Sequence, residues 1–451
     1  MTPVVDVQES ARRYVAEFEA FSEDGGGSAP GWLSERQAAA MARFAEVGFP
    51  TTRQEAWRFT DVRAIAQKDF VRASAPIGRV VSPDAVDAFL LGDRDRYSAV
   101  FVGGYYDEEL SSVAGLPIGV KLGSLASALE THGELIEQHL ARYTTHDNPF
   151  TTLNTAFIDD GAFVFIPRGT VLDRPLQLVF VASPESDEPS VWHPRSLVIV
   201  EREVEASLVE SYVAAGGGSY WTNAVTEVVV GEGARLNTYR IQREDGQAYH
   251  TATTQSYQER DSVYSCVTFA LGASLTRHDI NAVLDGEGAE CTLDGLSLLT
   301  GRQHVDHHTT LEHAKPHCTS WEYFNGIFDE RARGVFNGRI VVRPGAQRTD
   351  SKQTNNNLLL SERARADSQP QLEIYADDVK CTHGATLGPI DERQLYYLQT
   401  RGMGQDAARN LLTYGFCGEV LNAVTLDDLR RQLDELVRGR LAASVQKRGT
   451  R

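Results

Sequence analysis

Hydrophobic and polar residues follow three different patterns along the chain, and the changes divide it into three parts. Residues 1–148 have a mixed character, with apolar positions at helical spacing in SARRYVAEFEAF and LSERQAAAMARFAEVGFP. Residues 149–388 change to short β-branched and aromatic runs between Gly, Asp and Asn turns, such as AFVFIPRGTVL and PLQLVFVA. Residues 389–451 return to helical spacing. The pattern predicts a mixed N-terminal region, a central β-domain and a C-terminal helical domain.

Weak internal repeats in the central part indicate how its strands are arranged. VGEGARLN at 230–237 resembles DGEGAECT at 285–292, and DERARGVFNG at 329–338 resembles SERARADSQP at 361–370. Phrases that recur irregularly fit stacked coils of roughly 20–30 residues. A flat sheet with this many strands would curl or split. We therefore predict a β-solenoid, with a two-sheet sandwich as the competing fold.

The run NNNLLLSE at 355–362 is expected at a tight corner between coils, because asparagine tolerates a left-handed backbone. Its three leucines would then contribute to the core on both sides of the corner. A buried strand followed by a turn is the alternative that this stretch leaves open.

The C-terminal part carries an apolar stripe whose partner the sequence leaves open. The helix expected at 425–441 places six aliphatic side chains on one face: Leu426, Leu429, Leu433, Leu436, Val437 and Leu441. This stripe can pack on the chain's own solenoid or dock a partner. For a docking surface, the candidate anchors are large apolar or aromatic side chains: Tyr396, Tyr397, Leu411 and Phe416.

Composition narrows the class of protein. The chain has 451 residues, of which 41% are hydrophobic and 24% charged, as is typical of a soluble globular protein with a sizeable core. Its net charge of −18 argues against a general nucleic-acid or anionic-membrane binder, because both need a basic surface. Five scattered cysteines, no apolar signal core and no run of 18 apolar residues predict a reduced, cytoplasmic protein.

The motifs of common enzymes are missing from the sequence. It has no Walker loop, no G-x-S-x-G, no H-E-x-x-H and no C-x-x-C pair. We therefore expect a chain that binds no nucleotide through a Walker loop and is not a conventional enzyme.

A histidine-rich stretch at 302–318, RQHVDHHTTLEHAKPHC, is one candidate metal site. In an extended strand His304, Asp306 and His308 share one face, and His307 points the other way. Such a face could take a first-row metal, although the usual zinc spacings are absent. Polar residues stacked in a solenoid commonly satisfy one another, and Asp306 could fix a neighbouring imidazole. We therefore favour a structural role for this stretch.

The stretch VKCTHGATLG (379–388) is the other candidate site. In a strand Cys381 and His383 project to one face, at the junction of the last strands with the first C-terminal helix. A thiolate beside an imidazole near an open solenoid end is a suitable landing point for iron or sulfur. Two groups cannot complete a tetrahedral site, so a second chain would have to supply the rest. Spacing alone slightly favours the alternative, a structural cysteine beside a hydrogen-bonded histidine.

The block at 334–402, which contains FNGRIVVRPG, NNNLLLSE and VKCTHGATLG, closely resembles the SufB/SufD family of iron–sulfur cluster assembly proteins. GFPTTRQEAWRFTDV at 48–62 is similar to the N-terminal signature of that family, and the resemblance covers nearly the whole chain. The resemblance implies a mainly β fold, namely a right-handed parallel β-helix at 149–388 that is flanked by helical regions at 1–148 and 389–451.

The resemblance also implies a function, as part of the scaffold in which SufB, SufD and the ATPase SufC build iron–sulfur clusters. His383 matches the histidine of the family's CxHGAT motif, which works with a SufB cysteine at the interface between the two chains. Cys381 matches the motif's cysteine, with a less certain role, and the C-terminal helices would dock SufC. No tightly bound cofactor is expected, only iron or a transient cluster shared with the partner.

The same comparison favours the SufD branch, because SufB relatives carry their essential cysteine upstream of the family histidine and residues 319–380 contain none. The strands around Leu372 to Cys381 are expected to pair edge to edge with SufB, or with a second copy when the chain is isolated. Two other interpretations stay open. One is a metal-dependent enzyme on a solenoid, such as a sugar-acting lyase, although those enzymes are typically exported and this chain shows no signal. The other is a purely structural half of the complex, in which His383 is passive.

Overall fold

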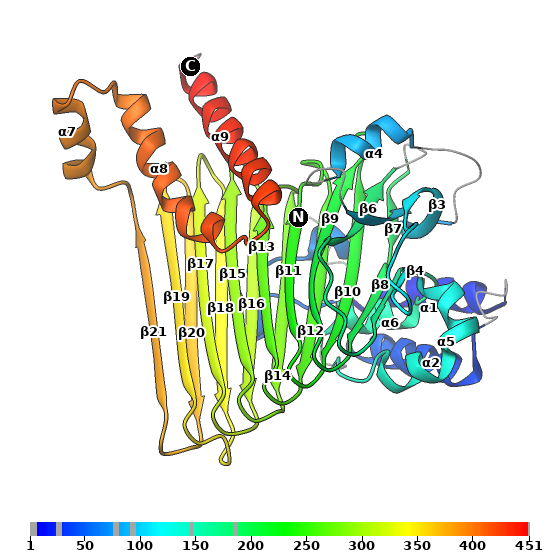
Figure 1. The fold of residues 1–451 in the computed structure, drawn as a ribbon. Helices are drawn as coiled ribbons and strands as arrows, with labels where there is room; N and C mark the ends of the chain where they lie inside the picture. The colour runs from blue at the N-terminus through cyan, green and yellow to red at the C-terminus, as the bar shows by residue number, and fades with distance from the viewer. Residues whose placement is uncertain are drawn as a thin grey trace.

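The computed structural model describes residues 7–23, 29–74, 81–90, 96–144, 148–183 and 188–449. Strands wound into a solenoid of about seven turns make up most of the molecule, and helices lie toward both ends of the chain (Figure 1). The prediction of a mainly β fold with flanking helices is therefore confirmed.

The N-terminal region folds largely into helices, which pack on the side of the first coils (Figure 1). An aromatic core holds them there, in which Tyr14 and Phe49 contact Trp221 of the central β-domain. The helices are α1 (Val7–Glu23), α2 (Gly31–Val47), α3 (Arg63–Ala66), α4 (Pro83–Phe89), α5 (Leu125–His139) and α6 (Pro149–Ala156), with a short 3-10 helix at Glu55–Trp57. The region also contributes β1 (Val71–Arg72), β2 (Tyr97–Val102), β3 (Tyr105–Ser112) and β4 (Lys121–Ser124).

The strands of the solenoid form two sheets, and from β8 onward successive strands along the chain alternate between them. The first sheet has the order β20-β18-β16-β14-β12-β10-β8-β5-β4, with β1 and β7 beside it, and the second has the order β21-β19-β17-β15-β13-β11-β9-β6-β2-β3. Neighbouring strands are parallel except in the pairs β2–β3 and β4–β5.

The bounds of these strands in the first sheet are β5 (Ala162–Ile166), β7 (Ser190–Trp192), β8 (Arg195–Val200), β10 (Tyr220–Val230), β12 (Tyr249–Gln258), β14 (Leu275–Leu284), β16 (His304–His313), β18 (Arg333–Val342) and β20 (Arg365–Ile374). Those in the second sheet are β6 (Leu176–Ala182), β9 (Glu205–Ala214), β11 (Arg235–Gln242), β13 (Val263–Ala270), β15 (Glu290–Leu299), β17 (Thr319–Phe328), β19 (Asp350–Leu359) and β21 (Lys380–Gly388).

The register between coils explains the internal repeats. Arg333 on β18 is paired with Arg365 on β20, so the similar phrases at 329–338 and 361–370 occupy equivalent places on adjacent coils. A parallel ladder between consecutive coils is the arrangement of a solenoid, and it excludes the competing two-sheet sandwich, whose strands are joined largely in antiparallel fashion.

The asparagine run does not lie at a corner, so that prediction is wrong. Asn355 and Asn356 lie inside β19, where each amide bonds to the preceding coil. The Nδ2 atom of Asn355 donates to the carbonyl oxygen of Phe324 (3.1 Å), and that of Asn356 donates to Oδ1 of Asn325 (3.2 Å). Asparagine suits this position because stacked amides form a ladder between coils, which an inspection of turn preferences does not anticipate.

The C-terminal helices are α7 (Glu392–Thr400), α8 (Gln405–Asn422) and α9 (Asp427–Gly449), and the last two cover part of the second sheet's outer face (Figure 1). The predicted stripe packs there on the chain's own solenoid, with Leu433 and Val437 buried in one cluster with Phe269. By contrast α7 contains no buried residue and projects beyond the last coil (Figure 1).

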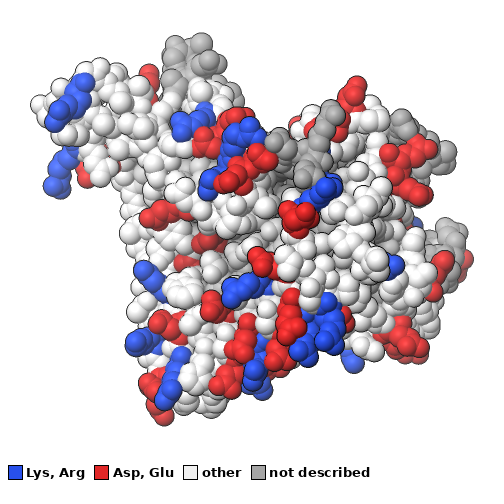
Figure 2. Space-filling view, in the orientation of Figure 1, with Lys and Arg blue, Asp and Glu red and all other residues white. Residues whose placement is uncertain are grey.

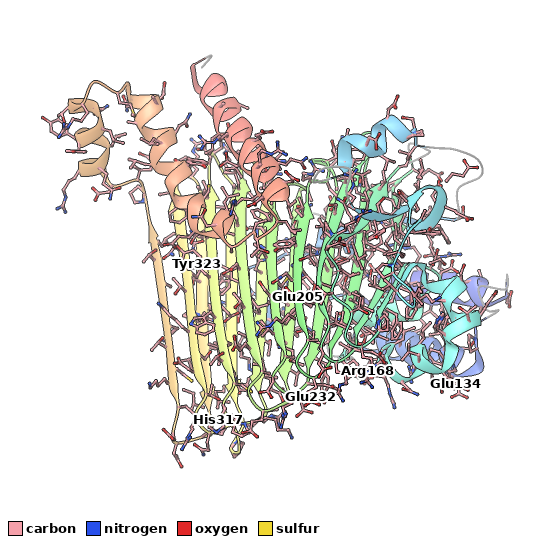
Figure 3. The ribbon with its side chains drawn as sticks, viewed as in Figure 1. Glu134, Arg168, Glu205, Glu232, His317 and Tyr323 are labelled. Carbon is pink, nitrogen blue, oxygen red and sulfur yellow. The ribbon has the colours of Figure 1, made fainter. Side chains whose placement is uncertain are left out.

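Charged residues of both signs are interleaved along the lower edge of the molecule in Figure 2. Turns from the first sheet to the second lie along this edge, as the labels of Glu232 and His317 mark in Figure 3. Neighbouring turns form ion pairs there, including Arg260 Nε with Glu232 Oε1 (3.3 Å). This edge therefore presents no surface of a single charge sign.

Candidate functional site

Cys381 and His383 lie on β21, which is the last strand of the second sheet. β21 pairs with β19 on one side and ends the strand order on the other, and β20 ends the first sheet in the same way. Within the described residues, the final coil therefore leaves one edge of each sheet uncovered. Uncovered strand edges offer backbone N–H and C=O groups with which a further strand can pair. The expected position of the motif at an open solenoid end is confirmed.

The two side chains share the face of β21 that continues the solenoid interior. Cys381 is in register with Ser351, and His383 with Gln353, and both partners on β19 are buried. Cys381 is half-buried and packs against the interior core cluster, whereas His383 is exposed. The alternation predicted from the sequence is correct, and the two residues differ in exposure because Cys381 packs against the interior core cluster, of which His383 is not a part.

The surroundings of Cys381 disfavour its ionised form. Burial, followed by the nearby carboxylate of Asp350, raises the pKa of the Cys381 thiol. Since the thiolate is the form that attacks electrophiles and binds metals, Cys381 is a weak ligand in the isolated chain. The exposed imidazole of His383 is the more accessible of the two groups.

Apolar side chains surround the open end. Ile374 and Tyr375 are exposed where β20 ends, and Leu387, near the end of β21, has 56% of its surface exposed. Ile374 and Tyr375 lie at the turn into β21 and Leu387 lies near the other end of that strand, so exposed apolar side chains occur at two places along the open end. The open end thus combines uncovered strand edges, an apolar rim and an accessible imidazole.

The side chains of the histidine-rich stretch are divided between the two faces of β16. His304, Asp306 and His308 share the outer face of β16, as strand alternation predicts, while the His307 ring faces the interior and lies 5.5 Å from that of Phe324. Among the residues that the structure describes, no group of three or more His, Cys, Asp and Glu side chains is placed to hold a metal ion. The structural interpretation of this stretch is the one that its surroundings support.

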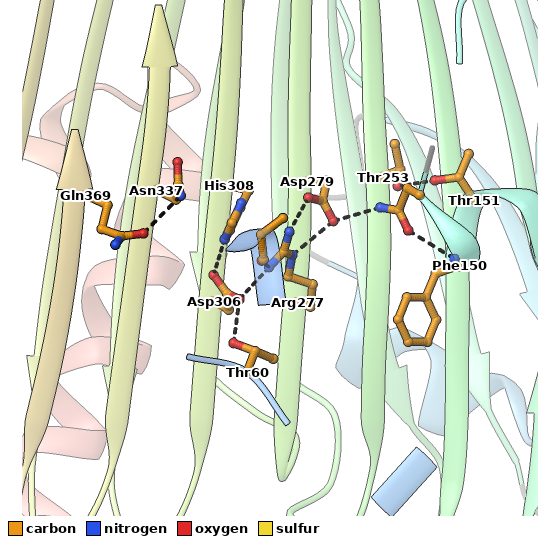
Figure 4. Close-up of polar contacts among 12 residues, drawn as sticks. Thr60, Phe150, Thr151, Thr253, Arg277, Asp279, Asp306, His308, Asn337 and Gln369 are labelled. Carbon is orange, nitrogen blue, oxygen red and sulfur yellow. Dashed lines mark hydrogen bonds and ion pairs between the residues drawn. The ribbon is translucent and has the colours of Figure 1, made fainter. Parts of the chain in front are cut away.

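Asp306 fastens the N-terminal signature to the solenoid (Figure 4). Its Oδ2 atom accepts hydrogen bonds from the hydroxyl of Thr60 (2.5 Å) and from Nη1 of Arg277 (2.6 Å). Arg277 also donates to the carbonyl oxygen of Ala56 (3.0 Å), and its guanidinium lies 4.2 Å from the ring centroid of Trp57. We call these five residues the signature latch.

Electrostatics reinforce the signature latch. Burial alone would raise the pKa of Asp306, but Arg277, followed by His308, holds it well below its usual range. Burial lowers the pKa of His304 to about 4, so this imidazole is neutral at physiological pH. Asp306 is therefore ionised in the folded chain, and its charge is matched by that of Arg277.

The four residues predicted to dock a partner differ in their surroundings. Tyr396, Tyr397 and Leu411 are exposed, and Tyr396 has 69% of its surface accessible. Phe416 instead packs partly against the apolar cluster that joins α8 and α9 to the second sheet, and its carbonyl oxygen accepts a hydrogen bond from Asn325 Nδ2 (2.8 Å). Tyr323, labelled in Figure 3 below α8, packs against the same cluster.

Sequence reasoning missed contacts that join residues of distant segments. Thr60, Arg277 and Asp306 meet only because three separate segments converge, and the sequence contains no local signal for their meeting. Gln353 lies in the interior next to His383, with Glu322 one strand further in, and only the register between coils reveals this. Within the described residues, no helix combines the length and the apolar character needed to cross a membrane.

Comparison with known proteins agrees with the family resemblance seen in the sequence. Residues 180–416 match the family model described as SUF system FeS cluster assembly, SufBD core domain, and residues 8–178 match the SufBD protein N-terminal region. An iron–sulfur cluster assembly SufBD family protein of Synechocystis is 34% identical over 414 residues, which cover 90% of each chain.

Two further relatives carry more specific names. The iron–sulfur cluster assembly protein SufD of Escherichia coli is 30% identical over 400 residues, 87% of this chain and 89% of the relative. The iron–sulfur cluster assembly protein SufB of Bacillus subtilis is 26% identical over 339 residues, 74% of this chain and 70% of the relative. With both of its regions matched and its relatives aligned along most of their length, the chain belongs to the SufBD family of iron–sulfur cluster assembly proteins.

Proposed function

We propose that this chain is the SufD-type component of the SUF assembly scaffold and pairs with a SufB-type partner through the open end of its solenoid. The observation that carries the proposal is the final coil, where uncovered strand edges, exposed apolar side chains and His383 occur together. Relatives named SufD and SufB both match this chain, which supports a pairing between two chains of one family. Edge-to-edge strand addition joins such chains through main-chain hydrogen bonds.

In this proposal the iron–sulfur cluster is cargo that the two chains share while it forms. His383 offers a ring nitrogen to iron, and histidine replaces cysteine in some cluster sites. His383 and Cys381 cannot fill a tetrahedral site alone, so the partner supplies the remaining ligands, a cysteine among them. Cys381 has a secondary role, because its thiol is disfavoured as a thiolate.

The same proposal gives the C-terminal helices a second task. While α8 and α9 cover the chain's own sheet, α7 and the exposed side of α8 present Tyr396, Tyr397 and Leu411 to a SufC-type ATPase. ATP-driven motion of the docked ATPase would shift the two β-domains and change the access to His383, provided that the ATPase contacts differ between the two arrangements.

The proposal locates the scaffold in the cytoplasm. All five cysteines are free thiols, and four of them are buried. Free cysteines in this number are usual where glutathione and thioredoxin keep thiols reduced. Reduced thiols are also what cluster assembly requires of its protein ligands.

Substitution of His383 tests the proposal. His383→Ala should leave folding and partner binding intact, because an exposed side chain contributes little to stability. Iron and acid-labile sulfide retained by the complex should fall roughly tenfold or more, since even groups that merely support a metal ligand cost about that much when removed. Cys381→Ser should have a milder effect. A His383→Ala complex with the wild-type cluster yield would instead show that the chain is a purely structural half of the scaffold.

A further inference from the structure

A row of three side chains leads from the solenoid interior to the open end. Glu322 on β17 is in register with Gln353 on β19, which is in register with His383 on β21. Neighbouring strands of a sheet lie about 4.8 Å apart, and residues in register point to the same face. Gln353 therefore lies directly between a buried carboxyl group and the exposed imidazole.

The amide of Gln353 is held on one side only. Its Nε2 atom donates a hydrogen bond to Oε2 of Glu322 at 2.5 Å. Its Oε1 atom is buried and has no hydrogen-bond partner among the described residues, although only 1% of the Gln353 surface is exposed. A buried acceptor without a donor costs about 1–3 kcal/mol, so this oxygen is placed to accept a hydrogen bond that the present arrangement lacks.

The opposite sheet restricts where that amide can go. Gly338 on β18 faces it so closely that a Cβ atom at this position would lie 2.1 Å from Nε2 of Gln353. The row on that sheet runs from Thr309 through Gly338 to Pro370. Pro370 therefore continues the row on the final coil, and a proline has no N–H to offer to the free amide oxygen.

His383 is the donor that the geometry makes available. We propose that Gln353 is a positioning residue for His383, accepting a hydrogen bond from one ring N–H so that the lone pair of the other ring nitrogen faces the partner chain. Glu322 fixes the direction of the amide by accepting its NH2 group. The inference rests on the proposed function of His383, and a fixed tautomer is how groups behind metal-binding histidines usually act.

The ionisation of Glu322 is consistent with this assignment. Burial raises its pKa to about 7, against the lowering effects of the Thr309 hydroxyl and the Gln353 amide. Above that pH the carboxylate only accepts hydrogen bonds. The NH2 group of Gln353 then turns to Glu322 and leaves its oxygen toward β21.

The test is the ring tautomer of His383 in the full-length chain labelled with 15N-histidine. His383 is assigned by the loss of its signals in His383→Gln, at about pH 8.5, where a free imidazole is neutral. Gln353→Leu, which keeps the size but removes the polar group, should change the tautomer ratio by roughly two- to tenfold, the range of one hydrogen bond. Thr354→Val, the next residue on the same strand, is the matched control and should leave the ratio unchanged.

Two further variants guard against an effect of altered folding. Gly338→Ala places a methyl group against the amide without removing a polar atom, and should change the ratio in the same direction as Gln353→Leu. Glu322→Gln keeps an oxygen acceptor for Gln353 and should retain the wild-type ratio. Identical His383 ring shifts in the wild type, Gln353→Leu and Gly338→Ala would overturn the proposal.

Cluster assembly separates this inference from the proposed function. In the complex, Gln353→Leu should lower the cluster yield roughly two- to tenfold, and should have no further effect when His383 is already alanine. If Gln353→Leu lowers the cluster yield equally in the wild-type background and in the His383→Ala background, the positioning role is overturned. If His383→Ala alone keeps the full yield, the proposed function fails, whereas the tautomer measurement still decides whether Gln353 positions the ring.

Discussion

Cys381 and His383 lie two positions apart on one strand and differ in their suitability as iron ligands. Cys381 is packed against the core, and burial raises the pKa of its thiol. His383 occupies the same face one step further along and is exposed. Because the imidazole of His383 is accessible and the thiolate of Cys381 is disfavoured, the histidine is the better candidate ligand, although cysteine is the commoner ligand of iron–sulfur clusters.

The buried carboxyl group of Glu322 makes stability depend on pH in a definite direction. Burial raises its pKa from 4.5 to about 7, so the folded chain holds a proton that the unfolded chain releases. This contribution to stability is fully present below pH 4.5 and is lost as the pH rises through about 7.

Glu322→Gln removes that dependence. We compare the melting temperatures of the variant and the wild type at each pH. The variant should gain relative to the wild type between pH 5.5 and pH 8.5, and the corresponding change in the free energy of unfolding is at most about 3 kcal/mol. Glu290→Gln, at an exposed position on neighbouring β15, is the control. A difference that does not change between the two pH values would show that Glu322 is not held protonated.

At the scale of elements, the local sequence pattern predicts the secondary structure of each segment, whereas the register between coils determines which side chains are in contact. The helical regions, the strands and the shared face of Cys381 and His383 all follow from spacing along the sequence. The asparagine ladder does not, because the carbonyl and amide groups that it bonds lie on the preceding coil. The pairing of Gln353 with His383 is equally invisible in the sequence, since it depends on which residues of β19 and β21 are opposite each other.

The signature latch is expected to hold the segment at 48–62 onto the solenoid. Asp306→Asn removes the charge that Arg277 faces and should weaken the attachment by about 1–3 kcal/mol, less than the loss of a whole buried pair because Asp279 still binds Arg277. Backbone amides of the segment should then exchange hydrogen faster, as mass spectrometry can measure.

The control for the latch is Asp261→Asn, which removes an exposed ion pair with Arg260 at a turn. Exposed pairs contribute about 0–1 kcal/mol, so exchange in the segment at 48–62 should stay at its wild-type rate. Unchanged exchange in Asp306→Asn as well would mean that the aromatic core alone holds the N-terminal region.

The exposed tyrosines of α7 provide the cleaner test of ATPase docking. Deletion of residues 389–451 would also uncover the apolar outer face that α8 and α9 bury. Tyr396→Ala combined with Tyr397→Ala should abolish SufC binding in a pull-down and leave the circular dichroism spectrum unchanged, because α7 has no buried residue. Gln399→Ala on the same helix is the control. Full SufC binding by the double variant would show that α7 is not part of the interface.

For the whole molecule, the solenoid has one end covered by N-terminal segments and one end that the described residues leave open. An exposed edge with apolar neighbours is an aggregation hazard unless a partner covers it. We therefore expect the isolated chain to sediment as a dimer at micromolar concentration.

A charge at the open end should prevent that association. Leu387→Lys places an ammonium group on the exposed rim, and charged side chains that point inward at a sheet edge oppose pairing. The variant should sediment as a monomer, whereas Val171→Lys, at an exposed position near the opposite end, should remain dimeric. If Leu387→Lys sediments like the wild type, the copies associate through another surface.

The central claim is that this chain is half of a cluster-building heterodimer served by an ATPase. The most direct measurement is co-expression with SufB-type and SufC-type proteins, anaerobic purification through a tag on this chain, and an absorbance spectrum of the product. The account predicts a complex of all three proteins that shows the visible absorption of an iron–sulfur cluster and contains iron and sulfide. A chain that elutes without both partners, or a complete complex that never acquires a cluster under conditions in which SufB-type protein and sulfide are supplied, would contradict it.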